Sequence, residues 1–379
     1  MVLNRIAVNI AFFLNGFILA NWSARLPRIQ EVYDANNGTI ATVLFTMALG
    51  AVIGMPFTGW VIVKNGSRRI TLIALILYCI FVPLIPFMPN VITLMMLYAI
   101  MGVTTGMLDV AMNAQAVMIE KAYQRPIMTS FHALFSLGMM LGGWCAVLFA
   151  KLQFDLSAHL SSIVVVSLMA AFWVSRNLIH DRPDASVKQD GPLFRIPNKA
   201  LVSVGVIALC CMLGEGAMTE WTANYMENVA LASKTIAPIA LSSFAGAMFL
   251  GRLFGDRIRA SWGDTKLIMT GGATASAGLL LAVLQPEPAV VIAGCFLVGL
   301  GLSTIVPITY SIAGNEKGLP SGVGISMVTT VGYTGFLFGS PIIGFIADAS
   351  NLKVSFCVVI VLFIIMTYLG FARMRSQKG

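Results

Sequence analysis

The sequence predicts an all-α membrane protein in which twelve transmembrane helices form two pseudo-symmetric six-helix bundles. Hydrophobic residues make up 58% of the 379 residues, charged residues only 11%, and the mean hydropathy is +0.87. A soluble protein carries about 25% charged residues, so a water-facing surface cannot be built from this composition. Nucleic-acid binding is not expected, because in so apolar a chain the net charge of +8 is better explained by loop charges that orient the helices.

The twelve spans follow from windows of about 20 mostly apolar residues, the length that crosses a hydrocarbon core of ~30 Å. Polar residues interrupt the first window and no cleavage site follows it, so we expect a retained helix and not a signal peptide. The predicted spans are 5–25, 38–63, 69–88, 91–118, 127–150, 158–177, 199–222, 235–257, 265–284, 288–313, 319–346 and 353–373.

The chain midpoint carries the only long polar segment, which predicts a linker between two groups of six helices. The expected domains are an N-terminal bundle (1–177), a cytoplasmic linker (178–198) and a C-terminal bundle (199–379). If both termini are cytoplasmic, most of the 24 Lys and Arg residues fall inside, and only Arg25, Arg28, Lys151, Lys234 and Lys353 stay outside. This bias indicates cytoplasmic termini, and we expect a multi-pass protein of a bacterial cytoplasmic (inner) membrane.

The six cysteines all lie in apolar runs without metal-ligand spacing, so no disulfide, metal site or cofactor is expected. An intramembrane enzyme would need a nucleophile elbow or a metal-binding histidine pair. The three histidines, at 132, 159 and 180, are not spaced for either. We therefore do not expect an enzyme.

An internal repeat appears at a shift of 197 residues, which superposes glycines of the two halves. The pairs are Gly66 with Gly263, Gly102 with Gly299, Gly138 with Gly335, and Gly142 with Gly339. Parallel repeats in transporters place the substrate site between the halves, near the bilayer midplane. Glycines in the fifth and eleventh spans would allow close helix packing, a gating motion, or both.

Several motifs resemble the major facilitator superfamily over nearly the whole chain. The segment from Gly59 to Arg69, with Lys64, Gly66 and Arg68, is similar to the family's loop after the second span, although Val63 stands where the family has Asp. The second half has Gly251-Arg252-Leu253-Phe254-Gly255-Asp256-Arg257. The resemblance implies the major facilitator fold and a gating role for Gly59, Lys64, Gly66, Arg68, Arg252, Asp256 and Arg257.

Within the superfamily, the fourth and fifth spans look most like the fucose:proton symporter group. Asp109 and Asn113 are similar to that group's acidic-then-Asn pattern, and His132 lies near a polar position of the group. The group's acidic residue late in the first span is replaced by Ser23. The resemblance therefore does not extend to sugar specificity.

The ionisable residues inside predicted spans are the candidate coupling groups, because such residues are costly at membrane depth. Asp109 lies eleven residues before Glu120, or ~16 Å from the cytoplasmic end of its span. It shares a helix face with Asn113. Glu215 has glycines on both sides and is expected in the outer half of the seventh span. We predict proton coupling at Asp109 and Glu215, with a structural hydrogen-bonding role as the alternative.

The remaining candidates are expected to contact the substrate or to pack the helices. Glu220 is either a ligand group or a solvated helix end, and Trp221 either stacks on a ring-shaped substrate or belongs to an interfacial belt. Val306 is the residue equivalent to Asp109 in the second repeat. Proton binding and release are therefore expected mainly in the first half. The predicted substrate residues are Asn15, Asn113, His132, Glu220, Trp221, Tyr310 and Thr329.

These features favour a secondary active transporter that moves a small polar solute, sugar-like or another metabolite, by alternating access, in symport with protons through Asp109. A proton-coupled drug or metabolite efflux antiporter is the alternative, and a non-transporting membrane sensor is a third possibility. The expected partners are a small-molecule substrate, protons and the lipid bilayer, and we expect a monomer.

Overall fold

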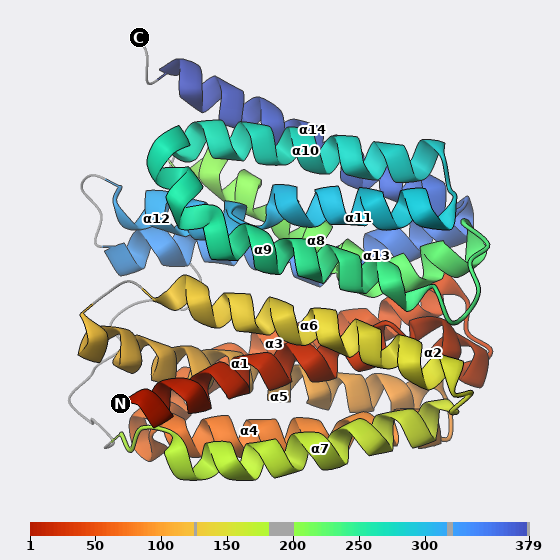
Figure 1. The fold of residues 1–379 in the computed structure, drawn as a ribbon, viewed down its shortest axis with the longest axis horizontal. Helices are drawn as coiled ribbons and strands as arrows, with labels where there is room; N and C mark the ends of the chain where they lie inside the picture. The colour runs from red at the N-terminus through yellow and green to blue at the C-terminus, as the bar shows by residue number, and fades with distance from the viewer. Residues whose placement is uncertain (125–126, 182–200, 317–320, 377–379) are drawn as a thin grey trace. The chain divides into compact units, whose positions relative to one another are not determined.

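A computed structural model describes residues 1–124, 127–181, 201–316 and 321–376. All regular elements in these ranges are helical (Figure 1). They are α1 (Val2–Ser23), α2 (Leu26–Tyr33), α3 (Asn37–Asn65), α4 (Ser67–Phe81), the 3₁₀ helix η1 (Val82–Phe87), α5 (Val91–Tyr123), α6 (Met128–Lys151), α7 (Leu156–Asn177), α8 (Val202–Asn228), α9 (Pro238–Trp262), α10 (Asp264–Leu284), α11 (Pro288–Leu302), α12 (Ile305–Gly314), α13 (Ser321–Ala349) and α14 (Leu352–Ser376).

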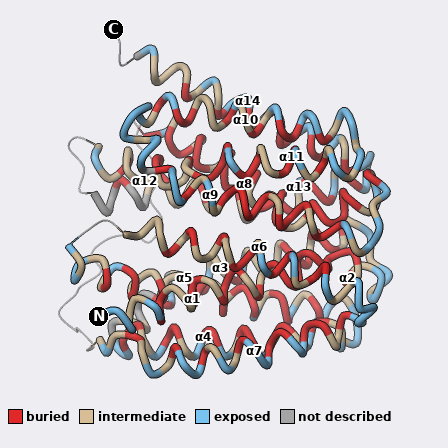
Figure 2. The backbone as a smooth tube through the Cα atoms, in the orientation of Figure 1, coloured by how far each residue is buried: buried red, intermediate tan, exposed pale blue. Residues whose placement is uncertain are grey.

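Twelve segments among the described residues are long and apolar enough to cross a membrane, which confirms the predicted helix class and number. The contacts divide the chain into two units, Met1–Gly191 and Pro192–Gly379. Of the predicted linker 178–198, residues 182–198 lie outside the described ranges. Within α7, buried and exposed residues alternate around the helix, as lipid contact on one side requires (Figure 2).

The tenth span departs from the prediction, because the expected continuous helix 288–313 is divided into α11 and α12. The break lies at Ser303 and Thr304, just before Pro307. Proline has no N–H to bond the carbonyl four residues earlier, and its ring crowds that carbonyl. The corresponding helix of the first unit, α5, runs unbroken for 33 residues.

Two of the four glycine pairs of the internal repeat make equivalent close helix contacts in each unit. A Cβ on Gly102 would lie 1.9 Å from the Met47 carbonyl oxygen, and one on Gly299 would lie 2.3 Å from that of Phe244, which is 197 residues after Met47. Gly138 against Phe13 and Gly335 against Leu209 repeat this for α1–α6 and α8–α13. Gly66 and Gly263, the single residues that join α3 to α4 and α9 to α10, share a φ of 78°. In this left-handed region a side chain would be strained.

We expect Gly102→Ala to lower the free energy of unfolding of the first unit by about 1–3 kcal/mol, because the added methyl must push α5 away from α3. Gly339→Ala is the matched control. Its Cβ would meet its nearest atom at 3.4 Å, an ordinary contact. Thermal unfolding of the two purified variants gives their relative stability. Equal stability would show that α3 and α5 can move apart to accept the methyl group without loss of stability.

Candidate functional site

Asp109 lies near the middle of α5, and Asn113 follows it on the same helix face. The Asn113 amide nitrogen donates to the Asp109 carboxylate oxygen Oδ1 at 3.2 Å and to the Asp109 backbone carbonyl at 2.8 Å. Both residues are half-buried. The structure therefore brings together the two residues that the sequence placed on one face, with the amide fixed beside the carboxyl group.

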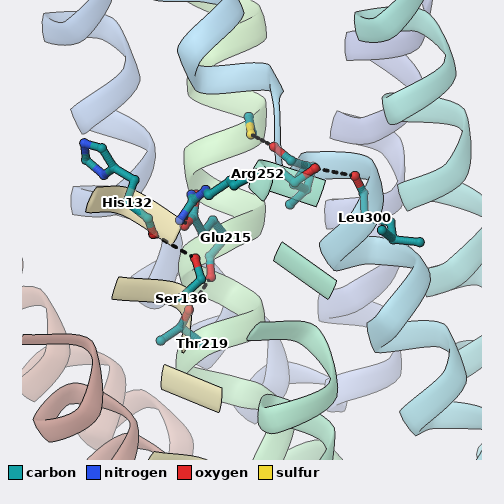
Figure 3. A network of polar contacts seen from close by, with 9 residues as sticks. His132, Ser136, Glu215, Thr219, Arg252 and Leu300 are labelled. Atoms are coloured by element: carbon teal, nitrogen blue, oxygen red, sulfur yellow. Dashed lines mark hydrogen bonds and ion pairs between the residues drawn. The ribbon is translucent and has the colours of Figure 1, made fainter. Parts of the chain in front are cut away.

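His132 and Asn15 lie on α6 and α1, which pack directly against each other in the first unit. The half-buried His132 ring contacts the Phe12 ring edge-on, with the centroids 5.3 Å apart. The His132 carbonyl oxygen accepts a hydrogen bond from the Ser136 hydroxyl at 3.2 Å (Figure 3). Asn15 is buried, with 8% exposure. The α1–α6 packing thus determines the positions of both side chains.

Glu215 and Arg252 form an ion pair inside the second unit (Figure 3). The Arg252 nitrogen Nη2 lies 3.3 Å from Glu215 Oε1, and the side chains are 9% and 15% exposed. Glu215 is the middle residue of the 27-residue α8, and Arg252 lies near the middle of the 25-residue α9. Both charges therefore lie in the interior of their helices, within the predicted spans 199–222 and 235–257.

Glu220 and Trp221 occupy interior positions in the second half of α8. The Glu220 oxygen Oε2 accepts a hydrogen bond from the Ser340 hydroxyl of α13, so a solvated helix end is the wrong description of this residue. Trp221 is fully buried, which also excludes a belt tryptophan facing lipid. Its ring can meet a solute only if the surrounding helices move.

Tyr310 and Thr329 stand on α12 and α13 of the second unit. Tyr310 packs against a buried apolar cluster formed by Leu201, Val204, Ala208, Ala313 and Val328. Thr329 is half-buried. Tyr310 therefore has a packing role in this conformation, beside the substrate role that the sequence suggested.

The end of α9 is held by Arg259, which lies beside the predicted gating residues Asp256 and Arg257. The Arg259 guanidinium binds the Asp264 carboxylate through two hydrogen bonds of 2.6 and 3.0 Å and donates to Ser311 at 2.7 Å. Arg257 is exposed, and the side chain of Asp256 lies outside the described residues. Arg259 and Asp264 thus join α9, α10 and α12.

In the first unit, a carboxylate that the sequence did not single out caps the helix after the loop. Asp181 accepts hydrogen bonds from the backbone N–H groups of Ser67 and Arg68 and, at 2.7 Å, from the Ser67 hydroxyl. Gln115 of α5 donates to Ser67 at 2.8 Å and exchanges two hydrogen bonds with the Ile179 backbone, at 3.1 and 2.9 Å. The chain after α7 is thereby joined to α4 and α5.

The other predicted residues of this loop differ in exposure and contacts. Arg68 donates to the Ser175 carbonyl at the end of α7, at 2.5 and 3.2 Å. Lys64 is exposed. Gly59 lies within α3 and not in the loop. Among the predicted set, Gly66 and Arg68 therefore belong to the capped junction.

Asp181 is expected to make stability depend on pH. Partial burial raises the pKa of this carboxyl, but the hydrogen bonds from Ser67 and Arg68 outweigh that effect, so its folded-state pKa is lowered. A lowered folded-state pKa stabilises the protein above the unfolded pKa of about 3.9, and this contribution is lost as the pH falls through the folded value.

Asp181→Asn should therefore lower the free energy of unfolding by about 1 kcal/mol at pH 7, the size of a typical helix cap. The difference from the parent should begin to shrink near pH 4 and should disappear only below the folded-state pKa of Asp181. Thermal unfolding of the variant and the parent protein, at pH 7 and at the lowest pH that keeps the protein soluble, measures this stability difference. A constant difference across this range would contradict a role for the charge.

His159 is a second interior residue that the sequence did not select. Its ring stacks on Phe149, with centroids 4.3 Å apart, and its Nε2 lies 2.8 Å from the Asn21 oxygen Oδ1. The residue is fully buried in α7. No periodicity signals this contact, because its partner lies 138 positions away in the sequence.

Comparison with known proteins gives a consistent family. A model described as Major Facilitator Superfamily matches residues 8–319. An uncharacterized MFS-type transporter of Yersinia pestis is 34% identical over 94% of this chain and 93% of its own. The membrane protein MosC of Rhizobium meliloti is 30% identical over 98% and 91%.

A solved structure shares the fold with little sequence similarity. A point mutant of the nucleoside transporter NupG matches with a TM-score of 0.78 at 12% identity, over 97% of this chain and 99% of the other. At this identity the match concerns the fold alone.

Proposed function

Since the chain belongs to the major facilitator superfamily, we propose that it carries a small polar solute across the membrane by alternating access, in symport with protons through Asp109. The proposal places the protein in a bacterial cytoplasmic membrane as a monomer with both termini inside. The resemblance of the fourth and fifth spans to the fucose:proton symporter group supports the proton as the coupling ion.

The observation that carries the proposal is the Asp109–Asn113 pair in the middle of α5. The amide fixes the carboxyl group in one place while the carboxyl remains half-buried, so a proton and a solute group can both reach it. An ionisable group in the interior of a transmembrane helix is expensive unless it is used. Coupling requires that the proton bind the two conformations with different affinity.

The charged side chains deep in the helices are mostly negative. Among the described residues, four Asp, Glu, Lys and Arg side chains lie at least eight residues from either end of their helix: Asp109, Glu215, Glu220 and Arg252. Three carboxyl groups accompany one guanidinium, and the guanidinium is paired with Glu215. No ion pair among the described residues involves Glu220, so this carboxyl is one that a bound cation can neutralise.

The test begins with a thermal-shift screen of the purified protein against sugars, nucleosides, amino acids and peptides. The solute that stabilises the protein is then used in uptake assays with pH-clamped vesicles. Accumulation of the solute driven by an inward proton gradient supports symport. Export of the solute driven by the same inward proton gradient would support the antiporter. Uptake that ignores the gradient would contradict proton coupling.

A further inference from the structure

The second half of α8 buries polar atoms that the protein itself does not satisfy. Asn224 is fully buried, and within the described part of the chain neither its amide oxygen nor its amide nitrogen has a hydrogen-bond partner. The Trp221 nitrogen Nε1 is likewise buried without a partner there. A buried polar group left unpaired costs about 1–3 kcal/mol, so two such residues one turn apart indicate that something else occupies this place.

A carboxylate lies on the same face of the helix. Glu220 precedes Asn224 by four residues, a spacing that puts the two side chains one above the other. The Ser340 hydroxyl of α13 donates to the Glu220 carboxylate. The Ser340 oxygen therefore lies beside the Glu220 carboxylate, on the helix face that also carries Asn224. Glu215 lies on a different face of α8, five residues from Glu220, and is paired with Arg252. The Glu220 cluster (Glu220, Trp221, Asn224 and Ser340) is therefore separate from the ion pair.

The cluster lacks a positive charge. Among the described residues, no ion pair involves Glu220, and its carboxylate therefore needs neutralisation by a bound ion or a proton. A proton on Glu220 would leave the Asn224 amide unsatisfied. A cation that retains a water ligand would satisfy both, because the Glu220, Ser340 and Asn224 oxygens can face the ion while the water accepts from Trp221 and the Asn224 nitrogen.

We propose that Glu220, Asn224 and Ser340 form a binding site for a hydrated monovalent cation, for which sodium is the candidate. Carboxylate, hydroxyl and amide oxygens are the ligands that hard cations prefer. A single carboxylate matches a single positive charge. Groups of three or more His, Cys, Asp or Glu able to hold a metal ion are absent from the described residues, so a divalent or transition metal has no comparable site. The half-buried position of Glu220 leaves an ion a way to the site.

The experiment measures thermal unfolding of the purified full-length protein in sodium chloride and in choline chloride at equal ionic strength. For the parent protein we expect sodium to raise the Tm saturably by about 4 °C or more, because a ligand that binds only the folded state stabilises it. Glu220→Gln should weaken the apparent sodium affinity at least tenfold. Asn224→Leu and Ser340→Ala should weaken it less.

Two controls separate this site from its surroundings and from the proposed proton site. Thr222→Val removes a neighbouring buried hydroxyl that, within the described part of the chain, bonds the Met218 carbonyl of the same helix, and it should retain the sodium response. Asp109→Asn should also retain it, since that residue belongs to the first unit. Equal Tm values of the parent in sodium and choline would overturn the proposal, even if Glu220→Gln does not fold. A full sodium response in Glu220→Gln would overturn it as well.

Discussion

Asp109→Asn is expected to abolish accumulation of solute against its gradient while leaving solute exchange across the membrane. In the parent protein, Asn113 donates to the backbone carbonyl and the side chain of Asp109. The amide of the variant has nearly the shape of the carboxyl group and can still accept this hydrogen bond. It cannot bind or release a proton. A proton gradient then has no group through which to bias the two conformations, because coupling needs differential binding. Uptake against the gradient should fall at least about 100-fold, a coupling free energy of about 3 kcal/mol.

The matched control for this variant is Thr104→Val in the same helix. Thr104 is buried, and among the described residues its hydroxyl bonds the Ile100 carbonyl alone, so its loss should leave proton-driven accumulation within about twofold of the parent. Thermal unfolding of both variants shows that each is folded. Retained accumulation by folded Asp109→Asn would remove Asp109 from the coupling mechanism.

Arg252→Met is expected to be among the most destabilising single changes in the second unit. It leaves Glu215, whose side chain is 15% exposed, as a carboxylate in the middle of α8 without its cation. Removing one partner of a buried ion pair costs about 3–5 kcal/mol. The double variant Glu215→Leu with Arg252→Met removes both charges and should recover most of that stability, because two apolar side chains of similar volume need no compensation.

A double-mutant cycle measured by thermal or denaturant unfolding tests this pair. Arg257→Met is the matched control on the same helix: Arg257 is exposed, and its loss should change the stability by less than about 0.5 kcal/mol. The double variant could instead lose as much unfolding free energy as the two single variants together. In that case the Glu215–Arg252 ion pair would contribute no coupling energy to stability.

The helices could be predicted from the sequence because each apolar window contains its own signal. The bilayer fixes the length of a span, and that length is visible in local composition. The break between α11 and α12 also has a local sign in the sequence, namely Pro307. The short helix α2 was missed, because eight residues between two spans leave too little periodicity to identify.

The contacts of the site could be predicted only where both partners lie on one helix. Asp109 and Asn113 are four residues apart, so helix geometry alone puts them together. Glu215 and Arg252 are 37 residues apart, and Asp181 reaches Ser67 over 114 residues. Such pairs depend on how helices pack, which composition and spacing do not encode. For the same reason the sequence could not decide between a substrate-stacking and an interfacial position for Trp221, which is fully buried.

The most direct test of proton coupling through Asp109 is a measurement of proton movement itself. Purified protein in lightly buffered vesicles, with no imposed gradient, is given the solute outside while the external pH is recorded. We expect solute entry to make the medium more alkaline, and the Asp109→Asn vesicles to exchange solute without any change in pH. Solute entry by the parent protein without proton movement, or an unchanged proton signal from Asp109→Asn, would contradict this account.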